Sequence, residues 1–273
     1  MKHLKTKALC ALFCLAGFLY WQNNGLMLTK ITHTKNVPQG LDGYKILQVS
    51  DLQNKTFGQN QEILLDKIRN ATPDIIVITG DLIDRNRTDL EKAMTFVDGA
   101  AAIAPVYYVS GNHEHQSGCF EALSAQLVSA GATVLENGKS MIQKNGASLE
   151  IIGLADKRVN PYFAQVLPTL LKDGEDTSFQ ILLSHRPELF ETYVQNDVDL
   201  AFTGHAHGGQ IRLPFIGGIF APNQGFFPAY TAGAYEKKNT SMVVSRGLGN
   251  STFPFRIFNR PELVMVTLKH EKI

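Results

Sequence analysis

Five short apolar segments of this chain are each followed by side chains that can bind a metal ion. The segments are residues 45–50, 74–79, 106–110, 179–184 and 199–203, each an apolar run of strand length. The side chains that follow them are Asp51, Asp81, Asn112 with His113, His185, and His205 with His207. A strand end delivers its side chains into a crevice and not into the core. The fold must therefore place polar ligands at five strand ends.

Helical patterns separate the first of these strands. Residues 61–70 and 88–103 carry apolar side chains at helical spacing, while strand-like segments dominate the later part of the chain. This order predicts an α/β domain with two sheets. We expect residues 23–42 to be a polar lead-in and residues 213–235, which are rich in Gly, Pro and aromatic residues, to be an ordered loop.

The first 22 residues differ from the rest. A lysine-bearing start precedes an apolar run over residues 8–21 that ends in Tyr20 and Trp21. This is the pattern of a secretory signal, although the run is shorter than the roughly 20 residues that span a bilayer. The aromatic pair suits an interfacial anchor. Two alternatives stay open: an uncleaved signal-anchor with residues 23–273 outside the cytoplasm, or a cleaved signal peptide and a secreted domain.

Composition limits the partners. The 273 residues are 44% hydrophobic, which suits one sizeable domain. The formal net charge is +1, but Lys2, Lys5 and Lys7 precede residue 22, and the remainder carries 23 basic against 25 acidic groups. This balance indicates no polyanion-binding surface, so we do not expect nucleic acid as a partner. We expect a monomer.

The candidate ligands suit a pair of divalent ions. A carboxylate can bridge two ions, oxygen ligands favour Mn²⁺ or Mg²⁺, and imidazole favours Zn²⁺ or Fe. Two ions roughly 3.5–4 Å apart can clamp a phosphate, ionise a bridging water and stabilise a leaving oxygen.

The same segments resemble, in order and spacing, the five motifs of the calcineurin-like metallophosphoesterases. The matching segments are Asp51-Leu52-Gln53, Gly80-Asp81-Leu82-Ile83-Asp84, Gly111-Asn112-His113-Glu114, Ser184-His185 and Gly204-His205-Ala206-His207. They cover roughly residues 45–210. The apolar start and the segment over residues 208–250 resemble the membrane-anchored bacterial branch of that family.

The resemblance implies a four-layer α-β-β-α sandwich, a dinuclear centre of Mn²⁺, Fe or Zn²⁺, and attack by a bridging hydroxide. It implies one ion at Asp51, Asp81 and His207, with Asp81 bridging to a second. It implies that the second ion is held by Asn112, His185 and His205 together with the bridging Asp81. His113 resembles the family's proton donor, which protonates the departing oxygen.

One position departs from the family pattern. The first motif is Asp-any-His, and here the third residue is Gln53. Gln53 ligates through its oxygen and favours Mn²⁺ or Mg²⁺, or water fills the gap and activity is lower, or the site is degenerate. The last alternative makes the domain a catalytically weakened or inactive metal-binding scaffold.

Several polar residues have two interpretations each. Asp84 either orients a ligand or caps a helix, and Glu114 either orients His113 or is solvated. Arg186, Arg212 and Arg246 either contact substrate or lie on the surface. Phe226, Phe227 and Tyr230 either form a rim for a lipid-like substrate or pack an ordered loop.

These observations predict a hydrolase of phosphoester bonds, a phosphatase or phosphodiesterase. The resemblance to the anchored branch favours a lipid- or envelope-linked phosphodiester or pyrophosphate, such as an acylated sugar nucleotide.

Overall fold

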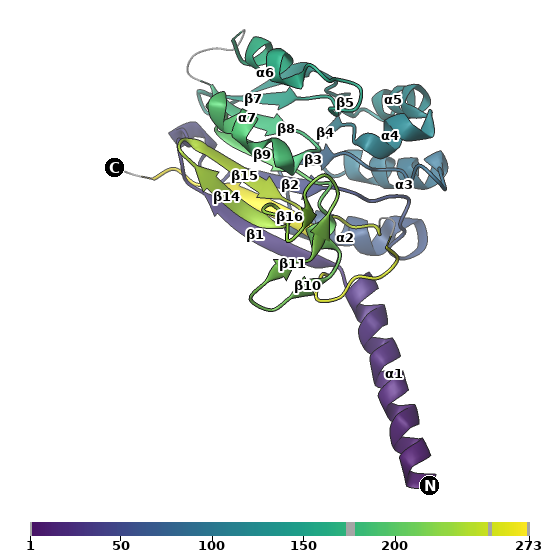
Figure 1. Ribbon diagram of the computed structural model, residues 1–273. Coiled ribbons are helices and arrows are strands. Elements are labelled where there is room, and N and C mark those ends of the chain that lie inside the picture. Colours follow the sequence, from purple (N-terminus) through teal and green to yellow (C-terminus); the bar gives the residue numbers. More distant parts are fainter. Residues whose placement is uncertain (1, 173–177, 251–252, 272–273) are drawn as a thin grey trace.

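The apolar strands pair into two six-stranded sheets in the computed structural model, which describes residues 2–172, 178–250 and 253–271 (Figure 1). The first sheet has the order β1 (Met27–His33), β16 (Glu262–Leu268), β2 (Lys45–Val49), β3 (Ile75–Thr79), β4 (Val106–Val109) and β5 (Thr133–Val134). The second has the order β14 (Gly233–Lys237), β15 (Thr240–Val244), β9 (Leu200–Thr203), β8 (Phe179–Leu183), β7 (Ala147–Gly153) and β6 (Gly138–Lys144).

The strands that lead into the motifs run parallel within each sheet. β2, β3 and β4 are parallel neighbours, with Leu47 opposite Ile76 and Val77 opposite Tyr107. β7, β8 and β9 are parallel neighbours in the other sheet. Parallel strands end at the same sheet edge, so the motif loops of each sheet emerge together.

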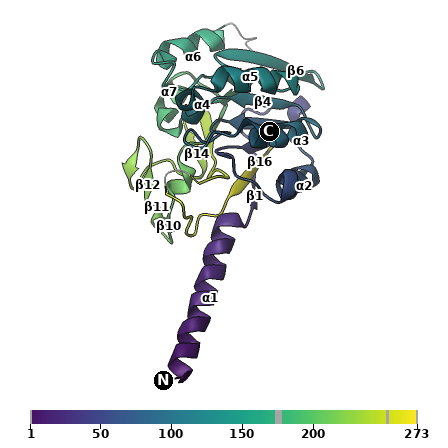
Figure 2. The ribbon, with the colours of Figure 1, turned by 90° about the vertical axis from the view of Figure 1, so that its right-hand side faces the viewer.

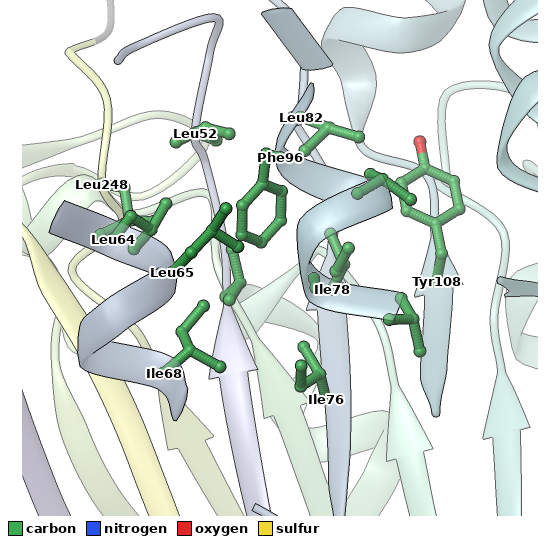
Figure 3. Packing of buried hydrophobic residues seen from close by; sticks show 14 of the residues in the cluster. Leu52, Leu64, Leu65, Ile68, Ile76, Ile78, Leu82, Phe96, Tyr108 and Leu248 are labelled. Carbon is green, nitrogen blue, oxygen red and sulfur yellow. The ribbon is translucent and has the colours of Figure 1, made fainter. Parts of the chain in front are cut away.

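Helices cover the outer faces of both sheets. The helices are α2 (Glu62–Ala71), α3 (Leu90–Ala101) and α5 (Phe120–Ser129) beside the first sheet, and α6 (Phe163–Lys172) and α7 (Phe190–Gln195) beside the second. Side chains alternate across each strand. Ile76 and Ile78 of β3 therefore pack with Phe96 of α3 (Figure 3), whereas Val77 joins a cluster that includes Ile181 of the other sheet. The expected α/β fold with two sheets is confirmed, and most strand pairs within the two sheets are parallel.

Short elements complete the chain. They are α4 (Asn112–Ser117), β10 (Arg212–Leu213), β11 (Gly217–Gly218), β12 (Phe220–Ala221), β13 (Gly225–Phe226), and the 3₁₀ turns η1 (Gln39–Leu41), η2 (Gln59–Gln61), η3 (Pro187–Leu189) and η4 (His207–Gly209).

The expectation that residues 23–42 are only a lead-in was wrong, because they contain β1, which pairs in parallel with β16. The ordered loop expected over residues 213–235 is confirmed as ordered, and it also holds β11, β12, β13, the end of β10 and the start of β14. β1 and β14 are edge strands whose residues are largely half-exposed or exposed, so their sequences lack the continuous apolar run of a buried strand.

The N-terminal segment forms one helix, α1 (Lys2–Asn24), which projects from the body of the molecule (Figures 1 and 2). Its apolar side chains are exposed, for example Leu12 at 62% and Phe13 at 70%. Among the helices of the described residues, none combines the length and the hydropathy that crossing a membrane requires.

Candidate metal centre

The five motif loops bring buried carboxylates, amides and imidazoles together at the strand ends. Asp51 follows β2, Asp81 follows β3, and Asn112 begins α4 after β4. His185 follows β8, and His205 and His207 follow β9. Each of these side chains is at least nine-tenths buried, so the cluster is shielded from bulk water.

One group of possible ligands consists of Asp81, His185 and His205, whose ligand atoms all lie within 4.8 Å of one another. His185 Nε2 is 3.4 Å from Asp81 Oδ2 and 3.1 Å from His205 Nδ1. The second group is Asp51, Asp81 and His207, with the same 4.8 Å limit. His207 Nε2 lies 3.3 Å from Asp51 Oδ1. Asp81 belongs to both groups.

Two buried oxygens indicate that the cluster suits a cation. Asn112 Oδ1 and Gln53 Oε1 have no hydrogen-bond partner within the described part of the chain. Gln53 Nε2 lies 3.4 Å from Asp81 Oδ2 and 3.3 Å from His207 Nε2. Amide oxygen and nitrogen differ by a half-turn of the side chain, which would place Gln53 Oε1 among these ligand atoms. The donor set of carboxylate, amide oxygen and imidazole fits divalent ions.

Hydrogen bonds set the proton positions of two histidines. His185 Nδ1–H donates to Thr79 O at 2.8 Å, which directs Nε2 toward the other ligands. His205 Nε2 contacts both Asn223 Oδ1, at 2.8 Å, and Arg186 Nη1, at 2.5 Å, and its Nδ1 faces His185 Nε2 at 3.1 Å. The Arg85 backbone N–H donates to His113 Nδ1 at 3.2 Å, so the proton of neutral His113 sits on Nε2.

His113 Nε2 lies 3.7 Å from Asp81 Oδ2, beside the cluster. Its backbone N–H donates to the other oxygen of the same carboxylate, Asp81 Oδ1, at 2.8 Å. The imidazole is thus held at the edge of the candidate centre with a proton directed inward.

Charges inside the cluster shift the pKa values strongly. Burial lowers the pKa of His185, but the adjacent Asp81 carboxylate outweighs burial and raises it to about 10. Burial alone would raise the pKa of Asp81, and the charge of His185 and its hydrogen bond bring it well below the usual range. Burial lowers the pKa of His207 to about 4, and burial with the charge of His185 lowers that of His205. His205 and His207 are therefore neutral, as metal ligands must be.

Glu114 organises the backbone around Asp81. Its carboxylate is fully buried and accepts N–H groups from Asp81 at 3.1 Å, Leu82 at 2.6 Å and Gly111 at 2.8 Å. The two motif loops that carry Asp81 and Asn112 are thus tied to one side chain. Glu114 supports Asp81 and does not orient His113 through these bonds; burial and the Asp81 charge raise its pKa to about 7.

The backbone at the cluster is strained. Five residues of the motif loops have φ values between 47° and 63°, in the left-handed region. They are Asp51, Gln53, Asp81, His205 and His207. A non-glycine residue in this region costs about 1–2 kcal/mol. Such conformations are typical of functional sites, where the surrounding fold holds them in place.

Three residues weighed as ligand-orienting or substrate-contacting lie elsewhere in the hydrogen-bond network. Asp84 Oδ1 accepts the N–H groups of Asn86 and Arg87 and closes its own turn. Arg212 Nη1 donates to Gly208 O at 2.9 Å and Thr231 Oγ1 at 3.1 Å, and Arg246 faces Glu262 at 3.7 Å. Their contacts support loops. The alternative that Asp84 caps the following helix was wrong, because the N-cap of α3 is Asp89.

Arg186 is buried beside the cluster, so the interpretation of Arg186 as a surface residue was wrong. It makes a two-pronged ion pair with Asp156, at 2.5 Å and 2.9 Å, and donates to Asn223 Oδ1 at 2.8 Å. Asp156 and Asn223 were not identified from the sequence. Asp156 follows the apolar run of β7 within three residues, which is the same pattern that marked the other motif loops.

A cavity of about 570 Å³ opens next to these residues. Asn112 and His205 form part of its wall, together with Arg186 and Asn223. Three further cationic side chains line it: Arg85, Lys157 and Arg158. An anionic group bound in this cavity would lie between the candidate ligands and several positive charges.

Comparison with known proteins agrees with this geometry. The profile of the calcineurin-like phosphoesterase family matches residues 44–209. The metallophosphoesterase YkuE of Bacillus subtilis is 35% identical over 240 residues, covering 85% of this chain and 82% of YkuE. The phosphodiesterase YaeI of Escherichia coli is 29% identical over 231 residues, covering 82% of each chain.

Among solved structures, a dimetal phosphatase from Danio rerio has a TM-score of 0.50 at 14% identity and covers 76% of this chain and 88% of its own. The phosphopantetheinyl hydrolase PptH of Mycobacterium tuberculosis also has a TM-score of 0.50, at 10% identity, with 76% and 91% covered. At these identities the likeness concerns the fold. The family match over the five motif loops identifies the chain as a member of the calcineurin-like phosphoesterase family, a hydrolase of phosphoester bonds.

Proposed function

We propose that this enzyme hydrolyses its phosphoester with two divalent ions, Mn²⁺, Fe or Zn²⁺. Asp51, Gln53, Asp81 and His207 would hold one ion, and Asp81, Asn112, His185 and His205 the other. The observation that carries the proposal is the position of Asp81 in both ligand groups, because one carboxylate can bridge two adjacent ions. Bound ions would supply Lewis-acid charge for the phosphate and acidify the attacking water.

Two side chains of the protein would act directly on the substrate. His113 carries its proton on Nε2, beside Asp81, and can donate it to the leaving oxygen. Arg186 would hold a substrate oxygen from the cavity side, since its ion pair with Asp156 fixes the guanidinium in place.

We propose a lipid- or envelope-linked phosphodiester or pyrophosphate, such as an acylated sugar nucleotide, as the substrate class. The cavity supports an anionic group beyond the scissile phosphate, because Arg85, Lys157 and Arg158 line it along with Arg186. Its volume of about 570 Å³ falls in the range of small-molecule sites, roughly 300–1,000 Å³.

The scaffold and location complete the proposal. Three hydrophobic clusters support the order helices, sheet, sheet, helices, which is the four-layer sandwich proposed for the domain over residues 23–273. We propose that α1 attaches this domain, as a monomer of the anchored bacterial branch, to the outer side of a cytoplasmic membrane. The exposed apolar run over residues 8–21 and the lysines before it support this placement.

Metal titration with generic substrates tests the function. The full chain in detergent should hydrolyse aryl phosphate mono- or diesters when Mn²⁺ is added, and Asp81→Asn should abolish the rate because it removes the shared carboxylate. Asp66→Asn, on the exposed face of α2, is the matched control. No turnover with any ion, and none after Gln53→His, would establish the inactive scaffold instead.

A further inference from the structure

Apolar side chains are exposed on two loops at the base of α1. We call them the aromatic platform and define it by Leu213, Phe215 and Ile216 of the β10–β11 hairpin and Phe253, Phe255 and Phe258 of the loop before β16. Each is at least 40% exposed, and Phe215 is fully exposed. The β10–β11 hairpin lies beside the end of α1 from which the helix leaves the body, in both views (Figures 1 and 2).

The aromatic platform is continuous with α1. The ring centroids of Phe18 and Phe258 are 5.6 Å apart, and the Arg256 N–H donates to Asn23 Oδ1 at 2.9 Å. The hairpin joins the same loop, because the Arg212 backbone N–H donates to Ile257 O at 3.0 Å. The helix, the loop before β16 and the hairpin are thus joined by direct contacts, and each carries exposed apolar side chains.

The exposure is built into the loop and does not reflect a lack of packing. Arg256 is fully buried and donates to the backbone oxygens of Arg246 at 3.0 Å and Gly249 at 3.1 Å. Its neighbours Phe255 and Phe258 are 48% and 53% exposed. A loop that buries its charge and exposes its phenyl rings is arranged for an apolar environment outside the protein.

Charge distinguishes a bilayer from another apolar partner. The sequence has no Asp or Glu in residues 1–41, 200–235 or 237–261, which supply α1 and the aromatic platform, although these segments contain several Lys and Arg. The Arg260 guanidinium lies 4.5 Å above the Trp21 ring at the junction of helix and body. A tryptophan next to an arginine is typical of the part of a protein that lies among the lipid headgroups. Because the segments of α1 and the aromatic platform have no Asp or Glu, anionic lipid is favoured.

A further pair of exposed aromatic side chains lies on the hairpin that reaches the substrate cavity. The turn between β12 and β13 places Pro222 and Asn223 in the cavity wall, where Asn223 Oδ1 lies 2.8 Å from His205 Nε2. Phe226 and Phe227, at the other end of this hairpin, are 73% and 68% exposed. The β12–β13 hairpin thus carries exposed aromatic side chains at one end and contacts the candidate metal centre at the other.

We propose that the aromatic platform inserts into the interface of an anionic phospholipid bilayer, as a second contact that orients the domain beside the membrane reached by α1. This contact goes beyond the proposed hydrolysis and does not depend on it. Its occupant is lipid, because the surface is apolar, basic at its margin and in contact with a helix whose residues 5–17 are all exposed.

Fluorescence with brominated lipids tests the inserted residues. Trp21 is the single tryptophan, so Trp21→Phe gives a dark parent chain that keeps α1. In this parent, Phe215→Trp reports from the hairpin tip and Val128→Trp, at a 60% exposed site on α5, is the matched control. With vesicles of phosphatidylcholine and phosphatidylglycerol, Phe215→Trp emission should shift to the blue and be quenched by brominated acyl chains, while Val128→Trp should not respond.

A binding measurement gives the second result. Phe215→Ser and Phe255→Ser should each weaken vesicle binding of the full chain by about tenfold, the amount expected for losing one buried phenyl ring. Vesicle binding without quenching of Phe215→Trp, or no vesicle binding at all, would overturn the proposal. A blue shift that needs no vesicles and grows with protein concentration would instead identify a second copy as the occupant. None of these measurements involves hydrolysis, so this proposal and the proposed function can fail separately.

Discussion

The carboxylate of Glu114 and the backbone N–H of Asp81 form a hydrogen bond of 3.1 Å inside the fold. Oε2 of Glu114 accepts this N–H and that of Gly111, while Oε1 accepts the N–H of Leu82. A side chain with two accepting oxygens is therefore required between two loops that carry candidate ligands.

Replacing Glu114 by Gln should loosen both loops. In Glu114→Gln one of the two accepting oxygens is replaced by an NH₂ group, which faces a backbone N–H. At least one backbone N–H of the two loops therefore loses its acceptor. We expect Mn²⁺ affinity to fall by about 10- to 100-fold, measured by calorimetry, with a lower melting temperature. Glu121→Gln, at an exposed position of α5, should change neither quantity. An unchanged affinity for Glu114→Gln would show that the loops hold their positions without it.

Gln53→His should change which ion the enzyme prefers. An imidazole in place of an amide oxygen favours Zn²⁺ over Mn²⁺, and we expect the ratio of the two affinities to shift by at least about tenfold. Gln53→Ala should weaken both ions. Competition titrations followed by metal analysis measure the ratio. Identical affinities for all three chains would mean that Gln53 does not touch the ion.

His113→Ala should slow hydrolysis according to the leaving group. General acid catalysis contributes about 10²- to 10⁴-fold for an alkoxide, which needs a proton, and much less for nitrophenolate, which leaves unprotonated. The kcat ratio between alkyl and nitrophenyl esters is the measurement. His115→Ala, two residues away and bonded to Ser110, is the control. A uniform loss for both esters would assign His113 to metal or substrate binding.

Metal binding at pH 8 should release a proton from His185. Its pKa is raised to about 10 beside Asp81, whereas a histidine in the unfolded chain has a pKa near 6.5. The protonated pair therefore stabilises the metal-free fold fully below pH 6.5, and this contribution is lost as the pH rises through about 10. Calorimetric heats in two buffers of different ionisation enthalpy give the number of protons released. His185→Asn should abolish the release, and equal heats for the unchanged chain would contradict the pairing.

Gly204→Ala should disrupt the position of Asp51. A Cβ at Gly204 would lie 1.9 Å from Ser50 Oγ and 2.5 Å from Asp51 Oδ2, where no side chain fits. We expect loss of the ion held by Asp51 while the fold remains, seen as reduced metal content with an unchanged far-ultraviolet circular dichroism spectrum. In Gly138→Ala the new Cβ meets only ordinary contacts at 3.9 Å, so metal content should stay the same.

The sequence predicts the strands of the centre well because they are buried on both faces. β3 and β8 are nearly continuous apolar runs, so their extents and the polar residues after them are visible without a structure. Edge strands such as β1 have one solvated side, and their mixed composition resembles a loop. Local sequence therefore predicts the parts of the fold that are shielded from water most completely.

The surroundings of the centre were less accessible to sequence analysis. Arg186 was expected at the surface because a guanidinium is usually solvated, and its burial depends on Asp156, thirty residues earlier. Asn223 reaches His205 from a hairpin of Gly, Pro and aromatic residues that has no apolar periodicity. Residues that contact one another only through tertiary packing cannot be paired from the local sequence pattern.

The left-handed backbone at Asp51, Gln53, Asp81, His205 and His207 has a consequence for engineering. Glycine adopts this conformation without steric penalty, so a glycine at any of these positions would relieve strain in the metal-free chain. The outcome of a search for thermostable variants would therefore depend on whether ions are present. Without ions, Gln53→Gly would lose only long hydrogen bonds; with ions, the ligand would be retained because a bound ion stabilises the fold.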